Sequence, residues 1–316
     1  MESIKLGQDG PAVTPLCIGT WAWGDKLFWS YGSDYDAQQL QEAFKAALEA
    51  GTTFFDTAEL YGFGLSEELL GQFMQQNGQT VQIATKYGPA PWRLTGESVA
   101  EALTASLKRL RVEQVTLYQV HWPFSFFMSQ TTLLNALADA VKQGKIEAVG
   151  VSNYSAKEMR EAYELLAARG VKLASNQVRY SLLTRQIETK GIIDTARQLG
   201  VTILAYSPLA QGLLTGKYTP ESAEKPSGAR WLDSRFSKEG LQKIAPVISL
   251  LKQIGEKHDR TPAQVALNWL IAQGNVVAIA GAKTAAQVQQ NAGSLGWRLS
   301  DDEIAQLEQV SRPWLK

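Results

Sequence analysis

The feature of this sequence that most limits its fold is a repeated alternation of short apolar runs with longer segments of helical period. From Leu16 onward the alternation occurs eight times, and the expected strands cover residues 16–20, 53–56, 81–86, 115–120, 146–151, 173–176, 201–206 and 276–280. Strands that alternate with helices form a parallel sheet, and eight of them close into a TIM (β/α)₈ barrel. Such a barrel commonly occupies a chain of 316 residues as one unit, so we expect a single domain over residues 1–316.

The segments between the expected strands carry helix signals. Residues 97–110 place apolar side chains on one face, with an acidic residue early and two basic residues late, an order that suits the helix dipole. Capping boxes, in which a hydroxyl and a later Glu or Gln satisfy the free amides of a helix end, mark further starts, and Pro262 takes a first helical position. The boxes run from Ser155 to Glu158, Thr261 to Gln264, Thr284 to Gln287 and Ser300 to Glu303.

Three segments go beyond a bare barrel. Residues 4–13 are typical of an N-terminal hairpin, and a further helix is expected after Ser300. Between Ser207 and about Gly240, after the seventh strand, lies a polar stretch with several Gly and Pro residues. A loop of that length inside a compact domain is usually a lid or a ligand clamp.

Composition excludes several classes of function. Thirty-one basic residues balance thirty-one acidic ones, which leaves no net field to attract nucleic acid or anionic lipid. No apolar run reaches the roughly 20 residues that span a bilayer. The one cysteine, Cys17, cannot form an internal disulfide, and the N-terminus has no export signal. We therefore expect a soluble cytoplasmic protein, monomeric or weakly oligomeric, with no nucleic-acid or membrane partner.

Polar side chains end three of the expected strands, at the barrel edge where active sites of this fold lie. Asp56 closes residues 53–56, Lys86 closes 81–86, His121 follows the strand 115–120, and Tyr61 comes five residues after Asp56. Each has an ordinary structural explanation when taken alone: a helix cap, a solvated strand end, a satisfied structural histidine or a turn aromatic. Their coincidence at one barrel mouth favours a catalytic site.

The chemistry that suits these four groups is protonation of a developing alkoxide. A tyrosine hydroxyl becomes an effective acid only when its anion is stabilised. An ammonium about 4 Å away contributes roughly 4 kcal/mol at an effective dielectric of about 20, so Lys86 is expected to lower the pKa of Tyr61. Asp56 would keep Lys86 charged and oriented, and a neutral His121 would donate a hydrogen bond to the carbonyl oxygen.

The segment Phe55-Asp56-Thr57-Ala58-Glu59-Leu60-Tyr61-Gly62 resembles the signature of the aldo-keto reductase family, and the similarity extends over nearly the whole chain. The resemblance implies a catalytic tetrad of Asp56, Tyr61, Lys86 and His121, with Tyr61 as the general acid. It also implies an NADPH-dependent enzyme that reduces aldehyde or ketone carbonyls, of the alcohol dehydrogenase or aldehyde reductase type.

Further stretches resemble the nicotinamide-cofactor contacts of that family. Ser152, Asn153 and Gln177 carry groups suited to the carboxamide, and Tyr206 offers a flat face for the ring. Glycines let backbone amides approach a pyrophosphate, and a cation at a helix start suits the 2′-phosphate of NADPH. The sequence departs from many family members at Gln287, where Arg is common, and at Ala280, where Pro is common. The remaining expected contacts are Ser207, Leu209, Gln211, Gly212, Gly281, Lys283, Thr284, Gln287, Gln290 and Asn291.

Aromatic residues are frequent in the loops expected at the barrel mouth. We expect Trp23, Trp29, Trp92 and Trp122 to line the substrate pocket, with Trp21 and Trp231 nearby, unless these rings only pack the loops. An apolar pocket favours small-molecule carbonyl substrates such as aryl aldehydes or short dicarbonyl compounds.

Other activities fit less well. No strand leads into a Gly-x-Gly-x-x-Gly segment, and His258, the second histidine, has no metal-ligand spacing around it, so no metal is expected. Two alternatives stay open. One is a cofactor-binding regulatory or partner module on the same fold, and the other is a Schiff-base aldolase or isomerase that uses Lys86.

Overall fold

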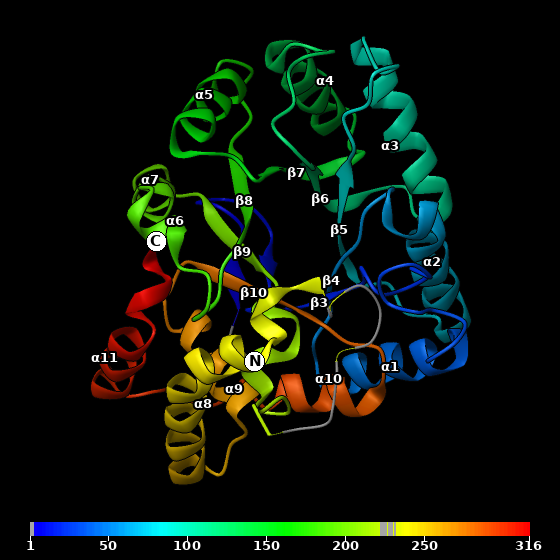
Figure 1. Ribbon diagram of the computed structural model, residues 1–316. Helices are drawn as coiled ribbons and strands as arrows, with labels where there is room; N and C mark the ends of the chain where they lie inside the picture. The colour runs from blue at the N-terminus through cyan, green and yellow to red at the C-terminus, as the bar shows by residue number, and fades with distance from the viewer. Residues whose placement is uncertain (1–2, 222–225, 227–229, 231) are drawn as a thin grey trace.

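The computed structural model describes residues 3–221, 226, 230 and 232–316. Its centre is a closed barrel of parallel strands in the order β10-β3-β4-β5-β6-β7-β8-β9, which confirms the predicted fold (Figure 1). Predicted and observed strands agree to within three residues at either end. The strands are β3 Leu16–Gly19, β4 Phe54–Asp56, β5 Gln82–Tyr87, β6 Val115–Val120, β7 Ile146–Ser152, β8 Leu173–Arg179, β9 Thr202–Tyr206 and β10 Val276–Gly281.

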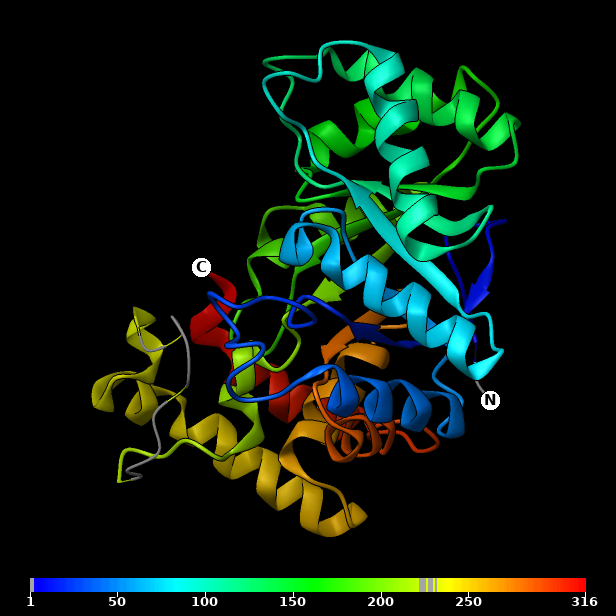
Figure 2. The same cartoon turned by 90° about the vertical axis from the view of Figure 1, so that its right-hand side faces the viewer.

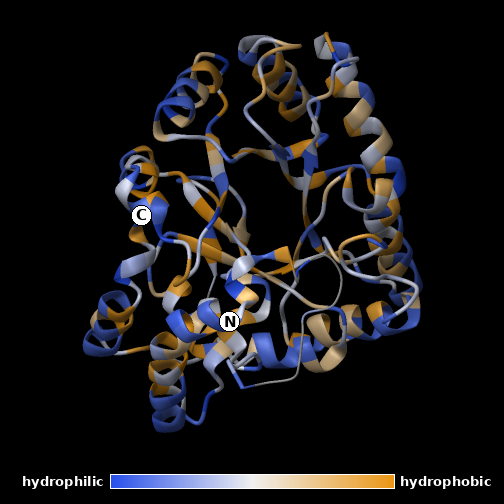
Figure 3. Cartoon of the chain, viewed as in Figure 1, coloured by the Kyte–Doolittle hydropathy of each residue, from blue (hydrophilic) through white to orange (hydrophobic). Residues whose placement is uncertain are grey.

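Helices surround the barrel and turn their apolar faces toward it. In Figure 3 the orange of apolar residues follows the strands and the inner helix faces, and blue marks the outer faces. The helices are α1 Ala37–Glu49, α2 Leu65–Asn77, α3 Gly96–Leu110, α4 Gln130–Lys142, α5 Ala156–Ala167, α6 Gln186–Thr189, α7 Ile192–Leu199, α8 Lys238–His258, α9 Pro262–Ile271, α10 Ala285–Ala292 and α11 Asp301–Val310.

The hairpin predicted for residues 4–13 is present, formed by β1 Ile4–Lys5 and β2 Ala12–Val13. Leu6 and Val13 belong to the apolar cluster inside the barrel, together with Cys17, Phe54 and Leu204. The hairpin therefore closes one end of the barrel. Figure 2 shows it in dark blue at the opposite end from the loop that follows β9. The hairpin leaves uncovered the second end, where the strands terminate.

The helix starts follow the predicted capping signals with one exception. Capping boxes form at Ser155, Thr261 and Ser300, and Pro262 opens α9. At α10 the Thr284 side chain accepts from the Gln287 amide, but the Gln287 Oε1 accepts from the amide of Lys283, 2.7 Å away, so the reciprocal box is absent. A further box at Asp36 and Gln39, which opens α1, was not predicted.

Residues 222–225, 227–229 and 231 of the predicted long loop lie outside the described residues. The described parts of 207–240 contain the 3₁₀ turns η2 Ala210–Thr215 and η4 Ser234–Phe236, and α8 begins at Lys238, so they are less irregular than the sequence suggested. The predicted helix after Ser300 is α11, and a last 3₁₀ turn, η5 Arg312–Leu315, follows it. No helix within the described ranges has the length and apolar character that a bilayer crossing requires.

Candidate active site

Asp56 and Lys86 form an ion pair at the open end of the barrel. Asp56 is the last residue of β4 and Lys86 the penultimate residue of β5, which pairs with β4 in parallel register. The Lys86 Nζ lies 2.5 Å from Asp56 Oδ1, and it also donates to the Thr57 carbonyl at 2.8 Å. Both side chains are buried, with 0% and 4% of the side chain exposed. A buried charge destabilises a protein unless an opposite charge lies beside it, and here each charge neutralises the other.

Tyr61 reaches the same ammonium from the turn after β4. Its hydroxyl lies 3.2 Å from Lys86 Nζ, and η1 Tyr61–Gly64 carries the side chain. Gly62 has a φ of 56°, and a Cβ there would lie 2.9 Å from the Gly24 carbonyl oxygen. This close approach of two loops explains the glycine after Tyr61 and fixes where the tyrosine can point.

A second buried carboxylate, Glu59, anchors the segment between Asp56 and Tyr61, and its role was not predicted. Glu59 accepts from the Gly88 amide at 2.6 Å, and the Arg93 guanidinium pairs with both of its oxygens. These contacts tie the segment to the loop after β5. The only sign of this role in the sequence was an acidic residue inside the segment 55–62. Only the fold shows that Arg93 neutralises it.

Glutamine amides hold the other oxygen of Asp56. Gln177 Nε2 donates to Asp56 Oδ2 at 2.7 Å, and Gln119 Nε2 lies 3.3 Å from the same atom. Gln177 was expected to contact a carboxamide, and the structure shows that its amide orients the carboxylate that pairs with Lys86. Charge-assisted hydrogen bonds of this kind fix the direction of an ion pair.

His121 lies beside Tyr61, near Asp56 and Lys86. Its ring centroid lies 5.9 Å from that of Tyr61, at an interplanar angle of 79°. Asn153 Nδ2 donates to the His121 carbonyl at 3.1 Å, and the Nδ1 of His121 is buried without a partner in the described structure. Burial, assisted by the charge of Lys86, lowers the pKa of His121 to about 3. The imidazole is therefore neutral, as expected for a hydrogen-bond donor to a carbonyl.

The pKa of Tyr61 differs from the expectation. Burial raises it, and although the charge and hydrogen bond of Lys86 oppose this, the pKa stays above its ordinary value. The expected net lowering is wrong for the protein without ligands, because desolvation of the phenolate exceeds the gain from the ammonium. The charge of Lys86 makes the rise in the pKa of Tyr61 smaller than burial alone would cause.

Lys86 is held in its charged form. Burial alone would lower its pKa, but the nearby Asp56 carboxylate and Tyr61 hydroxyl outweigh this effect and raise it. A Schiff base requires a neutral amine as nucleophile. The ion pair therefore argues against the aldolase alternative.

The depressed pKa of His121 makes stability depend on pH. The folded state favours the neutral ring, so its contribution is present above the ordinary pKa of 6.5 and is lost as pH falls toward 3. Between pH 6.5 and 5 this loss is on the order of 2 kcal/mol. We expect His121→Gln to lose that much less stability than wild type between pH 7 and pH 5, measured by urea unfolding. Equal losses in both proteins would refute the buried neutral imidazole.

The four residues expected to contact a nicotinamide are joined by hydrogen bonds. Ser152 Oγ donates to the Gln177 carbonyl at 2.9 Å, Asn153 Nδ2 lies 3.0 Å from Ser152 Oγ, and the Tyr206 hydroxyl lies 3.1 Å from Asn153 Oδ1. Asn153 has a φ of 63°. A left-handed non-glycine residue stores strain, which is typical of a functional site.

The loop after β9 has a second group of left-handed residues. Ser207, Ala210, Gln211 and Gly212 have φ values of 53°, 48°, 60° and 100°. The Gln211 Oε1 is buried without a hydrogen-bond partner in the described part of the chain. Successive amides in such turns form concave anion sites. Leu209, which was expected to contact the cofactor, is half-buried and packs against the main apolar core.

The end of β10 and the start of α10 bring the last expected contacts together. Lys283 precedes the helix, and its ammonium lies 4.4 Å from the ring centroid of Tyr35 and 5.7 Å from that of Trp29. Burial and the charge of Arg230 lower its pKa. Asn291 is buried with Nδ2 3.4 Å from the Gly281 carbonyl, whereas Gln287 and Gln290 are exposed.

The tryptophans expected in the pocket lie in different environments. Trp23 is fully buried, packs against Phe55 and Phe73, and donates to the Ala282 carbonyl at 2.9 Å, so it belongs to the core and its assignment to the pocket is wrong. Trp122 stacks on His121 with ring centroids 3.8 Å apart. Trp92 is 78% exposed in the loop after β5.

Trp21, two residues before Trp23, is a tryptophan that does lie beside Tyr61. Its ring centroid lies 6.5 Å from that of Tyr61, and it also contacts Phe28 and Trp29. Trp29 in turn lies 4.9 Å from the Arg230 guanidinium. Trp231 lies outside the described residues.

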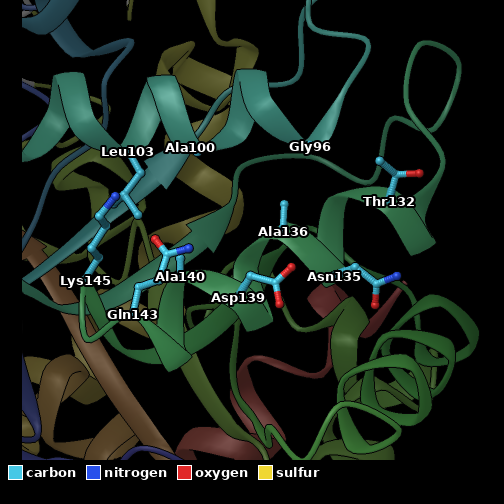
Figure 4. Close-up of a pocket in the computed structure, with 10 residues that line it drawn as sticks. All are labelled: Gly96, Ala100, Leu103, Thr132, Asn135, Ala136, Asp139, Ala140, Gln143 and Lys145. Atoms are coloured by element: carbon cyan, nitrogen blue, oxygen red, sulfur yellow. The ribbon is translucent and has the colours of Figure 1, made fainter.

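A separate groove of about 410 Å³ runs between α3 and α4 (Figure 4). Small side chains such as Gly96, Ala100 and Ala136 line it, with Asp139 and Lys145. None of the tetrad residues contributes to it. The chemistry of the site is therefore to be sought at the barrel mouth.

Comparisons with known proteins identify the family. The family model "Aldo/keto reductase family" matches residues 15–312. "Pyridoxal reductase, chloroplastic" of Arabidopsis thaliana is 40% identical, over 98% of this chain and 86% of that protein. A glycerol dehydrogenase from Gluconobacter oxydans has a TM-score of 0.84 at 29% identity, with 99% and 96% of the two chains covered. An aldo-keto reductase from Klebsiella pneumoniae, in complex with NADPH, has a TM-score of 0.76 at 28% identity, with 98% and 95% covered.

These matches cover the barrel, the tetrad and the loops that follow the strands, and the chain therefore belongs to the aldo/keto reductase family, whose members are oxidoreductases.

Proposed function

We propose that this protein uses NADPH to reduce aldehyde or ketone carbonyls to alcohols, with Tyr61 as the general acid. The observation that carries the proposal is the position of one buried ammonium, Lys86 Nζ, 2.5 Å from Asp56 and 3.2 Å from the Tyr61 hydroxyl. This arrangement places a proton donor beside a fixed positive charge.

Each residue has a distinct part in the reaction. A neutral His121 donates a hydrogen bond that orients the carbonyl oxygen, and Tyr61 gives its proton to that oxygen as negative charge develops there. Lys86 stabilises the tyrosinate that remains, and Asp56 with Gln177 keeps the ammonium in place. When bound, the reduced nicotinamide supplies the hydride that the carbonyl carbon accepts.

The residues around the mouth fit this cofactor. The left-handed turn at Ser207 and at residues 210–212 offers backbone amides to a diphosphate, and the Tyr206 ring offers a face to the nicotinamide. Lys283, just before α10, suits the 2′-phosphate, since a cation and free helix amides both attract an anion. The "Aldo-keto reductase yakc [NADP(+)]" of Schizosaccharomyces pombe, 32% identical over 97% of this chain, supports the same choice.

The walls of the mouth favour planar aromatic aldehydes. Trp21, which stacks on Phe28 with centroids 4.9 Å apart, lies beside Tyr61, and Trp122 stacks on His121. Flat rings prefer offset or edge contacts with such aromatic side chains. The name of the Arabidopsis relative makes pyridoxal, a planar heteroaromatic aldehyde, the first candidate substrate.

The test is NADPH oxidation, followed at 340 nm, with pyridoxal, 4-nitrobenzaldehyde and the short dicarbonyl glyoxal. We expect kcat/KM for the aromatic aldehydes to exceed that for glyoxal, and Trp21→Ala to reduce this preference by about tenfold because it removes a stacking face. His258→Gln, a change outside the mouth, is the control. Tight NADPH binding without turnover on any carbonyl would contradict the proposal and favour the regulatory module.

A further inference from the structure

Arg179 is a cation at the barrel mouth that the mechanism above does not use. It is the last residue of β8, two positions after Gln177, so the two side chains leave the strand on the same face. Gln177 contacts Asp56, and Arg179 therefore lies one layer further out, above the tetrad. In the parallel pairing of β8 with β9, Arg179 is the register partner of Tyr206.

The guanidinium of Arg179 has no hydrogen-bond or ion-pair partner among the described residues. Its Nε is buried without a hydrogen bond, and no carboxylate among the described residues pairs with it. The charged side chains that act on it are Arg235 and Asp233, but these two form a bidentate pair with each other, with Nε–Oδ1 at 3.0 Å and Nη2–Oδ2 at 2.6 Å. One positive charge in this group of three remains uncompensated.

A half-buried cation without a counter-ion is costly, and proteins seldom keep one unless a ligand supplies the missing charge. Burial lowers the pKa of Arg179, and the like charge of Arg235 lowers it further. The surrounding chain therefore does not stabilise the charge, and replacing this arginine should cost the fold little.

We propose that Arg179 binds an anionic oxygen group at the mouth of the active site, an inference that rests on the proposed function. Two sources present this chemistry there. One is the diphosphate of the cofactor, since Tyr206, the register partner of Arg179, leads into the left-handed turn at residues 207–212. The other is a carboxylate or phosphate carried by the carbonyl substrate.

The test compares Arg179→Gln and Arg179→Lys with wild type, and with Arg197→Gln as the control for loss of an exposed arginine on α7. Cofactor affinity is measured by fluorescence titration with NADPH and with NADH, which needs no turnover. Substrate preference is measured as kcat/KM for 4-carboxybenzaldehyde relative to its uncharged methyl ester. Thermal unfolding is recorded for every variant.

We expect Arg179→Gln to unfold at the wild-type temperature or above, and to lose about 10- to 100-fold in one of the two binding readouts, the range for a charge-assisted hydrogen bond. Equal weakening of NADPH and NADH identifies the diphosphate, because both cofactors carry it. A selective loss for the carboxylated aldehyde identifies the substrate. Arg179→Lys should restore part of either loss.

Unchanged affinity for both cofactors together with an unchanged preference would overturn the inference, and so would a lowered unfolding temperature with no effect on either ligand, which would mark Arg179 as structural. Because the titration does not depend on turnover, an inactive protein whose NADPH affinity falls on Arg179→Gln would contradict the proposed reduction and leave the anion site standing.

Discussion

Replacing Tyr61 with phenylalanine should lower kcat by about 10²- to 10⁴-fold, the usual contribution of a positioned general acid. The substitution removes only the hydroxyl that lies 3.2 Å from Lys86 Nζ, and the ring keeps its contacts with Trp21 and His121. Affinity for NADPH should stay within a few-fold of wild type. Steady-state kinetics with 4-nitrobenzaldehyde and fluorescence titration with NADPH measure the two effects separately.

A matched control is Tyr118→Phe. Tyr118 on β6 is also a buried tyrosine, its hydroxyl has no hydrogen-bond partner in the described structure, and its side chain belongs to the main apolar core and not to the cluster inside the barrel. This variant should turn over at the wild-type rate. Wild-type kcat in Tyr61→Phe would remove Tyr61 from its assigned role and leave protonation to another group.

The second large effect concerns the buried pair of Asp56 and Lys86. Lys86→Met leaves a carboxylate with 4% of its side chain exposed and no counter-charge, so we expect a loss of about 3–5 kcal/mol in the free energy of unfolding. Asp56→Asn leaves the ammonium in the same position and should cost a similar amount. Each single variant should also lose at least about 10²-fold in kcat, because the tyrosinate is no longer stabilised.

The double variant Asp56→Asn with Lys86→Met separates stability from catalysis. Removing both charges removes the uncompensated one, so much of the stability should return, while turnover stays as low as in Lys86→Met. Urea unfolding and NADPH oxidation of the four proteins form a complete cycle. Additive stability losses in the double variant would show that the two groups are not coupled, and recovered turnover would deny Lys86 its catalytic part.

The barrel, and the strand ends at which Asp56, Lys86 and His121 lie, could be predicted because both depend on local patterns. A strand that is buried on both faces has a short continuous apolar run in its sequence, and the end of this run marks the end of the strand. Asp56, Lys86 and His121 each end such a run, so their meeting follows from the closure of the barrel. The hairpin and three capping boxes were predicted for the same reason, since each is specified within a few residues.

What the tertiary structure decided is which neighbour each side chain meets. Trp21 and Trp23 have the same local pattern, yet one faces Tyr61 and the other is buried against Phe55, because the turn after β3 directs them apart. The amide of Gln177 orients Asp56, and desolvation keeps the pKa of Tyr61 high despite Lys86.

By itself, the sequence determined the closed ring of strands, their order, and the positions of Asp56, Lys86 and His121 at or just after strand ends, because apolar periodicity fixes which residues end a strand. Only the tertiary structure decided which charges are neutralised. Glu59 pairs with Arg93 across two loops, whereas Arg179 pairs with no carboxylate in the part of the chain that the structure describes. Charge compensation depends on distances between residues far apart in the chain and on how much water is excluded around them, and no local pattern records either quantity.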